Sequence, residues 1–320
     1  MRVSALRIER PKVLEMIEFD IQAPGPDDIL VKTLACGICW FELKAYLGEV
    51  PIEYPFIGGH EGIGIVADKG EKVADLKVGD LVTTWSKAAF ADYYLIPRSR
   101  AVKIASNIKE PEFWISEPPK CATTATTHLG VAPGNNLVLI GCGYMGLLHL
   151  QVLPKEWLPN LIAIDLSERQ LQLAQRFGAT HTIAVKPDHN QEVLAEVQEI
   201  CDGRVDIVIE AAGSSNALEL AGNMLRTAGI LSIYGFHTHT ETIDTGQWHL
   251  KGLRVFNTSP GISNFSLDDF YKAVALMKRG IFNQRPLISH KYEFKKGIEV
   301  IKNLCHERPA DYIKGVFIFP

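Results

Sequence analysis

The sequence has few cysteines, no long apolar run and little excess charge of either sign, and each of these shortages excludes a class of protein. Six cysteines among 320 residues are too few for the disulfide framework of a secreted scaffold. No apolar run approaches the roughly 18 residues that a membrane span requires. The 37 acidic and 33 basic residues give a net charge of −4, so no strong field attracts nucleic acid or an anionic membrane. We therefore expect a cytoplasmic protein with reduced thiols.

The pattern of apolar residues changes along the chain and predicts two domains, as does a length of 320 residues. The first residues, MRVSALRIERPKV, alternate apolar and charged side chains and predict a strand, not a signal peptide. Short runs such as EGIGIVA and ADYYLIP continue to about residue 125 and indicate a β-rich domain. After about residue 285 the pattern is mixed again, and it ends in GVFIFP, a strand that we expect to return to the first domain.

Between these parts, apolar strands alternate with amphipathic helices. We expect strands at 137–141, 161–165, 182–185, 205–212 and 230–235, and helices at 167–179, 190–201 and 214–226. This alternation predicts βαβ units and an α/β fold with a parallel sheet covered on both faces. We assign residues 1–125 and 285–320 to a β-rich domain and 126–284 to a doubly wound domain, and expect a ligand site in the cleft between them.

The segment LVLIGCGYMG places Gly141, Gly143 and Gly146 in G-x-G-x-x-G spacing directly after an apolar strand. The first glycine permits a tight turn, the second lets the backbone approach a pyrophosphate, and the third lets the helix pack close to the strand. Free N–H groups at the start of the helix then hold the phosphate charge. Asp165, which ends the next strand, is placed to accept hydrogen bonds from ribose hydroxyls and to repel a 2′-phosphate, which favours NAD over NADP.

Other residues near this pattern are open to two interpretations. Tyr144 and Met145 belong to the loop and count as cofactor-binding candidates, and Arg169 either contacts the ribose or is an exposed helical arginine. His237 and His239 follow a later strand and could approach the nicotinamide, but two histidines in a polar loop are more often solvated. A doubly wound domain that binds no cofactor is the competing interpretation of the glycine pattern.

A second pattern consists of Cys36 and Cys39 in C-x-x-C spacing, followed further along the chain by His60 and Glu61. Cysteine, histidine and carboxylate ligands suit zinc, and a catalytic zinc uses three protein ligands and one open position. By itself the cysteine pair is equally compatible with buried small residues, a redox pair or half of a four-cysteine site. No second C-x-x-C occurs, so a closed structural zinc site is not expected.

Together, these patterns and several further segments resemble the medium-chain dehydrogenase/reductase family, in its zinc-dependent alcohol and polyol (sorbitol and threonine dehydrogenase-like) branch. The similarity covers nearly the whole chain and includes PGPDDILVKTLACGIC, GHEGIGIV, GEKVADLKVGDLV, the run from EPPKCATTATTHLG to GCGYMG, VDIVIEAAG and YEFKKGIEVIK. The resemblance implies a Rossmann domain beside a GroES-like catalytic domain. It also implies assembly into a dimer or tetramer.

The resemblance further implies the residues of the active site. Cys39 matches the cysteine ligand of the family, and His60 matches the histidine ligand. Glu61 matches the adjacent glutamate, which ligates zinc or relays between water and zinc. Glu117 matches a further glutamate near the metal in the polyol branch, and Cys121 is the fallback ligand. The implied catalytic and metal-binding set is Cys39, His60 and a carboxylate from Glu61 or Glu117.

Two residues near Cys39 depart from the family pattern, and Cys36 falls outside the ligand position. Phe41 stands where a hydroxyl residue begins the proton relay, and phenylalanine cannot pass a proton. The proton must then leave through water, a ribose hydroxyl or a nearby glutamate. Glu42 replaces the aspartate that orients the ligating histidine. Trp40 and Phe41 either pack in the core or form an apolar wall that selects the substrate.

The cysteine-rich lobe that carries a structural zinc in many relatives is missing, because GDLVTTWSKAAFADYYLIP passes directly from one strand to the next. We therefore expect one catalytic zinc, no structural zinc, NAD as cofactor and a small-molecule alcohol or ketone as partner. The leading hypothesis is hydride transfer between NAD(H) and a secondary alcohol or polyol. Two alternatives stay open: a redox-neutral epimerase, lyase or cyclase on the same scaffold, and a non-catalytic NAD-binding module.

Overall fold

The computed structural model describes residues 1–104, 108–186, 189–263 and 266–320. They form two compact units. Unit 1 contains Met1–Lys120 and Leu267–Pro320, and unit 2 contains Cys121–Ser266. No helix in these described ranges is both long enough and apolar enough to cross a membrane.

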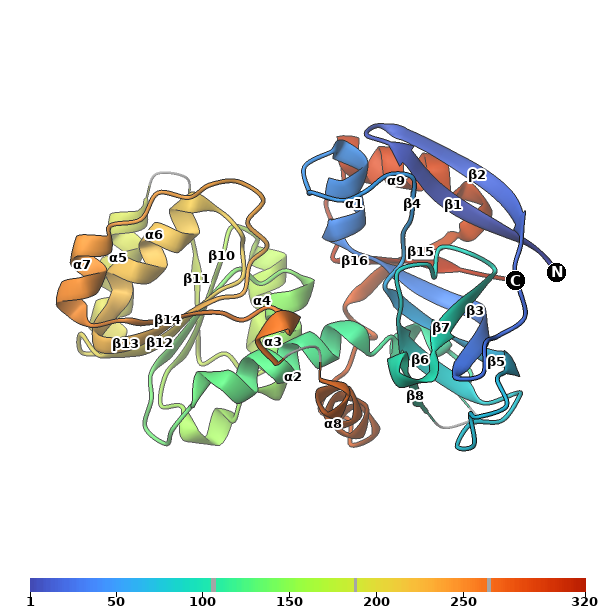
Figure 1. Ribbon diagram of the computed structural model, residues 1–320. Coiled ribbons are helices and arrows are strands. Elements are labelled where there is room, and N and C mark those ends of the chain that lie inside the picture. Colours follow the sequence, from blue (N-terminus) through green and yellow to red (C-terminus); the bar gives the residue numbers. More distant parts are fainter. Residues whose placement is uncertain (105–107, 187–188, 264–265) are drawn as a thin grey trace. The chain divides into compact units, whose positions relative to one another are not determined.

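Unit 2 is built on a six-stranded parallel sheet in the order β11-β10-β9-β12-β13-β14. Its strands are β9 (Leu137–Ile140), β10 (Leu161–Asp165), β11 (His181–Ala184), β12 (Val205–Glu210), β13 (Leu225–Ile233) and β14 (Arg254–Asn257). Its helices after the first strand are α3 (Tyr144–Val152), α4 (Glu168–Arg176), α5 (Asn190–Ile200), α6 (Ser215–Met224) and α7 (Thr245–Lys251). Figure 1 shows α3 and α4 on one side of this sheet and α5 and α6 on the other. The predicted α/β fold is confirmed.

The central strands of unit 2 explain where a ligand belongs. Every residue of β9 and of β12 is buried, as expected for parallel strands covered by helices on both faces. The chain moves outward from β9 through β10 to β11, then returns to the other side of β9 with β12. Ligands of open parallel sheets bind at the carboxyl ends of the strands where the strand order reverses in this way. Here that place lies between the ends of β9 and β12.

Unit 1 contains two sheets, one in the order β2-β1-β4 and one in the order β15-β16-β3-β5-β6-β8, with β7 paired to β3. Its first strands are β1 (Arg2–Arg10), β2 (Val13–Asp20), β3 (Asp28–Ile38), β4 (Phe56–Ile57) and β5 (Glu61–Lys69). They are followed by β6 (Leu81–Trp85), β7 (Tyr93–Pro97), β8 (Ala101–Lys103), β15 (Ile288–Glu293) and β16 (Lys314–Ile318). Its helices are α1 (Trp40–Leu47), α8 (Leu267–Lys278) and α9 (Gly297–His306), and α2 (Glu117–Leu129) begins in it.

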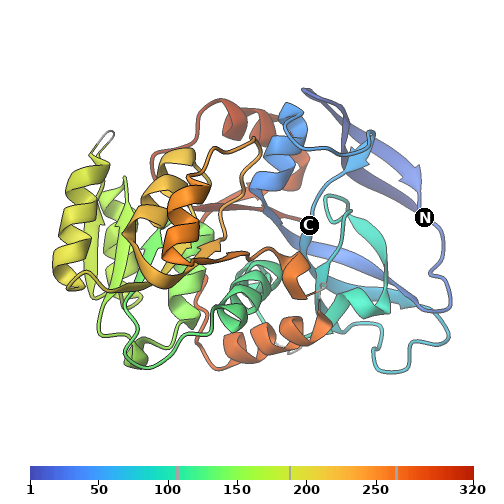
Figure 2. The same ribbon diagram turned by 60° about the vertical axis from the view of Figure 1, so that its left-hand side comes forward.

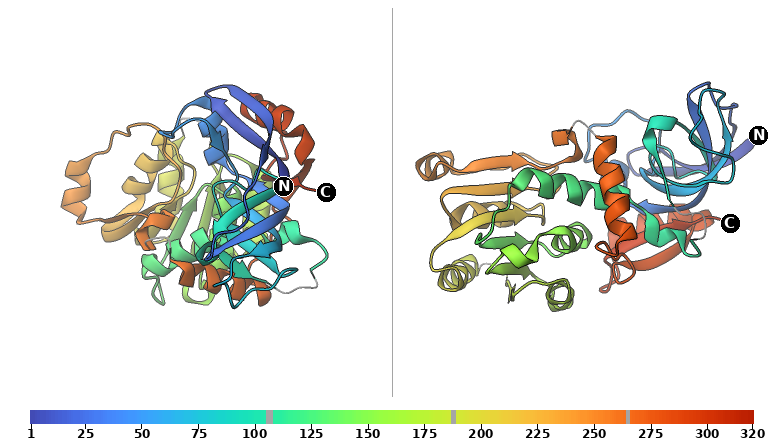
Figure 3. Two further views of the ribbon diagram at one scale, coloured as in Figure 1. Left: turned by 45° about the vertical axis from the view of Figure 1, so that its right-hand side comes forward. Right: turned by 90° about the horizontal axis from the view of Figure 1, so that it is seen from below.

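The C-terminal part of the chain completes unit 1. Strand β16 pairs antiparallel with β3, so that Gly315 lies opposite Ile38. Figure 2 shows α9 beside α1, and Figure 3 shows α9 beside the β1–β2 hairpin. The last strand therefore reaches the same sheet as the strands that flank Cys39 and His60.

Helix α8 belongs to unit 1, although its residues fall inside the range 126–284 expected for the other domain. Phe270 and Val274 of this helix lie in one apolar cluster with Ile288 and Val316. The units divide at residues 120 and 266. The boundaries at 125 and 285 stay a prediction.

Candidate active site

The predicted metal ligands come from three places in unit 1 that its fold brings together. Cys39 directly precedes α1, at the end of β3. His60 directly precedes β5, and Glu61 is the first residue of that strand. Glu117 begins α2. Because β3 and β5 are antiparallel neighbours, with Cys36 opposite Gly62, the end of one strand lies beside the start of the other.

Two groups of potential ligand atoms share His60. The ligand atoms of Cys39, Glu42 and His60 lie within 4.8 Å of one another, and so do those of His60, Glu61 and Glu117. The His60 ring also forms a side-chain hydrogen bond with the Cys39 thiol. The structure thus places the other three predicted residues, Cys39, Glu61 and Glu117, around the ring of His60.

Glu42 fixes the orientation of that ring. Nδ1 of His60 lies 2.7 Å from Oε1 of Glu42, and the N–H of Gly59 donates to the same oxygen at 3.0 Å. Glu42 is 1% exposed, so this contact is shielded from water. A proton on Nδ1 leaves the lone pair on Nε2 available, which is the arrangement that metal-ligating histidines usually have. Glu42 therefore takes the place of the aspartate that orients the histidine in the family pattern.

The charges around His60 favour a cation. Burial opposes a charge on His60, but the carboxylate of Glu42 and the thiol of Cys39 raise the pKa of His60 well above its usual range. Burial raises the pKa of the Cys39 thiol, so ionisation of this thiol needs a nearby positive charge. Oε2 of Glu42 and Oε2 of Glu61 are buried without a hydrogen-bond donor in the described part of the chain. A half-buried thiol and imidazole beside buried carboxylate oxygens that lack a donor fit zinc.

Lys314 is part of this site, and sequence reasoning missed it. Its Nζ lies 2.7 Å from Oε1 of Glu61, and the exposed fractions of the two side chains are 6% and 2%. Burial opposes the charge of Lys314, but the carboxylate of Glu61 nevertheless raises its pKa. A Cβ on Gly37 would lie 1.8 Å from Oε2 of Glu61, so only glycine leaves room for this carboxylate. No sequence motif marks Lys314, apart from its position at the start of a buried apolar strand.

The aromatic residues after Cys39 pack beside the site. The ring of Phe41 meets His60 edge-on, with ring centroids 5.8 Å apart, and meets Phe56 in the same way at 6.3 Å. The guanidinium of Arg308 lies 3.8 Å from the ring centre of Trp40. Phe41 and Trp40 are partly buried against the core of unit 1. Phe41 therefore shields the histidine ring and contributes no group that transfers a proton.

Cys36 and Cys121, the two other cysteines considered in the sequence analysis, are not among the potential metal ligands of the described residues. Cys36 is fully buried in β3, and its Sγ lies 3.6 Å from the carbonyl oxygen of Gly37. Burial raises its pKa, and it belongs to neither group of potential ligands among the described residues. Cys121, the fallback ligand, is also absent from both groups within those residues.

The glycine loop of unit 2 has the expected geometry. Gly141 adopts a φ of +99°, in the region that favours glycine. A Cβ on Gly146 would lie 2.0 Å from the carbonyl oxygen of Gly141, so a side chain there would separate helix from strand. A Cβ on Gly143 would meet nothing within 4 Å, which leaves open space beside the backbone at the start of α3. This loop fits a dinucleotide pyrophosphate.

Asp165 lies beside that loop. Its Oδ2 accepts a hydrogen bond from the N–H of Cys142 at 2.6 Å, and its Oδ1 accepts one from the N–H of Ser167 at 2.8 Å. A carboxylate has about four lone-pair sites, so two remain for ribose hydroxyls. Of the other candidates, Arg169 is exposed, Tyr144 is buried and Met145 is half-buried.

The interpretation of His237 as a solvated loop residue is wrong. Its side chain is 11% exposed and contacts the carboxylates of Glu210, at the end of β12, and Glu241, in its own loop. His239 is exposed, as expected. A histidine in a polar loop becomes buried here because two acidic side chains pair with both ring nitrogens.

Comparisons with known proteins agree with this fold. Residues 25–106 match the family model of the alcohol dehydrogenase GroES-like domain, and residues 145–279 match that of the zinc-binding dehydrogenases. L-threonine 3-dehydrogenase of Pyrococcus furiosus is 28% identical over 87% of this chain and 88% of its own. Sorbitol dehydrogenase of Bacillus subtilis is 26% identical over 84% of each chain.

Solved structures show the same fold. 2R,3R-butanediol dehydrogenase of Bacillus subtilis superimposes with a TM-score of 0.84 at 24% identity, over 99% of both chains. Benzyl alcohol dehydrogenase of Acinetobacter calcoaceticus has a TM-score of 0.83 at 23% identity, over 100% of both chains. The chain belongs to the zinc-dependent alcohol and polyol dehydrogenases of the medium-chain dehydrogenase/reductase family.

Proposed function

We propose that this protein is a zinc-dependent dehydrogenase that transfers hydride between NAD(H) and a secondary alcohol or polyol, or the matching ketone. The observation that carries this proposal is that an oriented His60 is shared by two groups of potential ligand atoms, one with Cys39 and one with Glu61 and Glu117. The named relatives are dehydrogenases of threonine, sorbitol and arabinitol, which are secondary alcohols or polyols. These names do not favour a redox-neutral enzyme or a non-catalytic module.

We assign the zinc to Cys39, His60 and a carboxylate of Glu61 or Glu117, with one position left for substrate. Bound zinc would polarise the substrate oxygen as a Lewis acid, and NAD would accept the hydride. Glu42 keeps the proton of His60 on Nδ1. Lys314 holds Oε1 of Glu61, the oxygen that lies 3.9 Å from Nε2 of His60.

The proton of the alcohol needs a path other than residue 41. Phe41 packs against the His60 ring and excludes water from that side. Since phenylalanine accepts no proton, the path runs through water, a ribose hydroxyl or one of the glutamates. We propose NAD rather than NADP because Asp165 carries a negative charge beside the glycine loop.

The test is a substrate screen combined with metal analysis on the same sample. Secondary alcohols, cyclitols and sugar alcohols would be offered with NAD and with NADP, and formation of the reduced cofactor followed by absorbance. The proposal expects about one zinc per chain and turnover with at least one of these alcohols. A stoichiometrically zinc-free protein that binds NADH tightly would contradict the enzyme proposal.

A further inference from the structure

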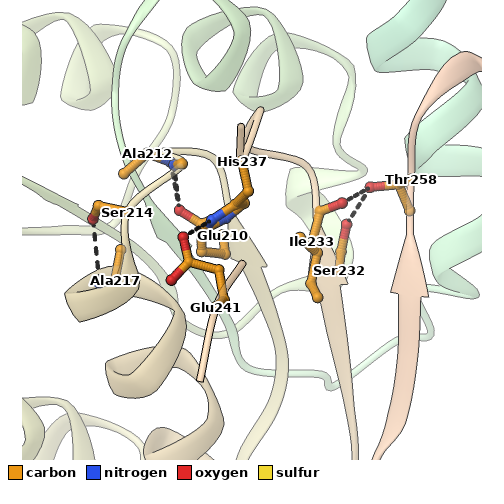
Figure 4. A network of polar contacts seen from close by, with 10 residues as sticks. Glu210, Ala212, Ser214, Ala217, Ser232, Ile233, His237, Glu241 and Thr258 are labelled. Carbon is orange, nitrogen blue, oxygen red and sulfur yellow. Dashed lines mark hydrogen bonds and ion pairs between the residues drawn. The ribbon is translucent and has the colours of Figure 1, made fainter. Parts of the chain in front are cut away.

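A buried carboxylate ties together two loops at the carboxyl edge of the unit 2 sheet. Glu210, the last residue of β12, is 0% exposed. Its Oε1 accepts hydrogen bonds from the N–H groups of Ala212 at 2.8 Å and Gly213 at 2.7 Å. Its Oε2 lies 2.8 Å from Nε2 of His237, in the segment after β13 (Figure 4). One side chain therefore holds the backbone that follows β12 and the ring that follows β13.

His237 makes a second contact of the same kind. Its Nδ1 lies 2.9 Å from Oε1 of Glu241, so each ring nitrogen faces a carboxylate. Only the doubly protonated ring donates from both nitrogens. Burial opposes this charge, but hydrogen bonds to Glu241 and Glu210 raise the pKa of His237.

Acidic side chains from two segments face His237. Glu210 faces it from β12, and Glu241 faces it from its own segment. The side chain of Ser215, at the start of α6, forms a hydrogen bond with Glu241, and the charge of His239 acts on the same carboxylate. When His237 loses one of its two ring protons, one ring nitrogen carries a lone pair in place of an N–H group. The carboxylate that faces this nitrogen then loses its hydrogen-bond donor. Glu241 is the carboxylate released, because Glu210 keeps its two backbone donors.

These loops pack directly against the glycine loop. Ile140, the last residue of β9, pairs in register with Glu210. A Cβ on Gly141 would lie 2.7 Å from the backbone nitrogen of Ala212. A Cβ on Gly213 would lie 3.1 Å from the carbonyl oxygen of Phe236, the neighbour of His237. Contacts therefore run from the His237 segment through the backbone after β12 to the loop proposed to hold the pyrophosphate.

We propose that His237, as an imidazolium, is a positioning residue that sets this edge of the sheet for a nicotinamide dinucleotide. The inference rests on the proposed function for NAD binding and adds a residue that the glycine motif does not contain. Deprotonation of His237 has two effects, and both weaken cofactor binding. It loosens the segment after β13, and it removes one positive charge near the site of an anionic ligand.

The test measures the affinity of the full-length protein for NADH by fluorescence titration from pH 6 to pH 9, without substrate. We expect the wild-type affinity to fall about tenfold at the alkaline end, as lost hydrogen bonds to charged groups imply. H237Q keeps a polar amide without charge, so its affinity is low and flat across this range. H237K keeps a positive charge, so it should bind NADH with the affinity that the wild type has at acidic pH. Its affinity should fall only when the pH approaches the pKa of the lysine. H181Q, at an exposed position in β11, is the control and retains the wild-type profile.

The outcomes separate this inference from the proposed function. If H237Q binds NADH with the wild-type affinity and pH profile, the inference is overturned and the NAD-binding proposal stands. If the wild type binds no NADH at any pH, the NAD-binding proposal fails first. Thermal unfolding of each variant shows whether it is folded. If the loss of affinity in H237Q were purely structural, the positive charge of H237K would not restore binding.

Discussion

Nζ of Lys314 and Oε1 of Glu61 lie 2.7 Å apart inside unit 1, although 253 residues separate them in the sequence. Lys314 is the first residue of the C-terminal strand, and Glu61 is the first residue of β5. The pair connects the end of the chain to the proposed zinc site. It also stabilises a carboxylate that burial would otherwise disfavour.

Lys314→Met should therefore destabilise the protein, because it leaves the charge of Glu61 buried and unpaired. Removal of one partner of a buried ion pair typically costs about 3–5 kcal/mol of unfolding free energy. Urea denaturation of the zinc-free protein measures this cost. Lys314→Arg should keep most of the stability, and adding Glu61→Gln to Lys314→Met should restore part of it. Equal stability of Lys314→Met and wild type would show that the pair is not formed.

Glu42→Gln tests how His60 is oriented. The amide oxygen of glutamine can still accept the Nδ1 proton of His60, but the negative charge is lost. Changes of residues that hold a metal-ligating histidine typically cost about 10–100-fold in metal affinity. Competition with a zinc chelator measures the affinity, and Glu49→Gln, on the loop after α1, provides a control. An unchanged zinc affinity in Glu42→Gln would remove Glu42 from this role.

His149 makes the stability of unit 2 sensitive to acid. It is fully buried in α3, and neither ring nitrogen has a hydrogen-bond partner within the described residues. Burial lowers its pKa from 6.5 to about 3. The unfolded chain therefore binds this proton first, and stability is lost as the pH falls below about 6.5, by up to about 1.4 kcal/mol per pH unit.

His149→Leu should remove that loss and stabilise the protein, since it replaces an unpaired buried polar ring with an apolar side chain. The measurement is the free energy of unfolding of wild type and variant at pH 5 and pH 7. The gain should be larger at pH 5. His181→Gln, at an exposed position in β11, should show no such gain. A gain that does not depend on pH would mean that His149 is not neutralised by burial.

Asp165→Asn tests the choice of cofactor. The asparagine oxygen can still accept from the N–H of Cys142, so the glycine loop keeps its local support. Loss of the charge should weaken NADH binding and strengthen NADPH binding. We expect the ratio of the two dissociation constants to change by about tenfold or more, or about 1.4 kcal/mol. Fluorescence titrations with both cofactors measure this ratio, and an unchanged ratio would show that Asp165 does not contact the ribose.

Local patterns predicted the central parts of the fold and site. The glycines at 141, 143 and 146 act within one strand-to-helix turn, and Cys39 and His60 stand at strand ends where a motif can be read. The strand predicted at residues 161–165 is β10, and its observed bounds, Leu161–Asp165, are the same. A short apolar run that ends in an acidic residue is typical of a buried strand.

The remaining parts depend on contacts between distant segments. Lys314 meets Glu61 only because β16 pairs with β3, and a lone lysine before a strand gives no sign of this. His237 is buried only because Glu210 and Glu241 both reach it. Helix α8 joins unit 1 through packing that its own periodicity does not specify. Sequence patterns identify elements, whereas such partners appear only in the folded chain.

The most direct test of the zinc-dehydrogenase account is the zinc content of wild type and Cys39→Ala, measured by mass spectrometry beside NADH affinity and alcohol turnover. The account predicts about one zinc per wild-type chain. It predicts that Cys39→Ala loses the zinc and the turnover but binds NADH as the wild type does, because the glycine loop belongs to unit 2. A Cys39→Ala variant that keeps its zinc and full turnover would contradict the proposed metal site.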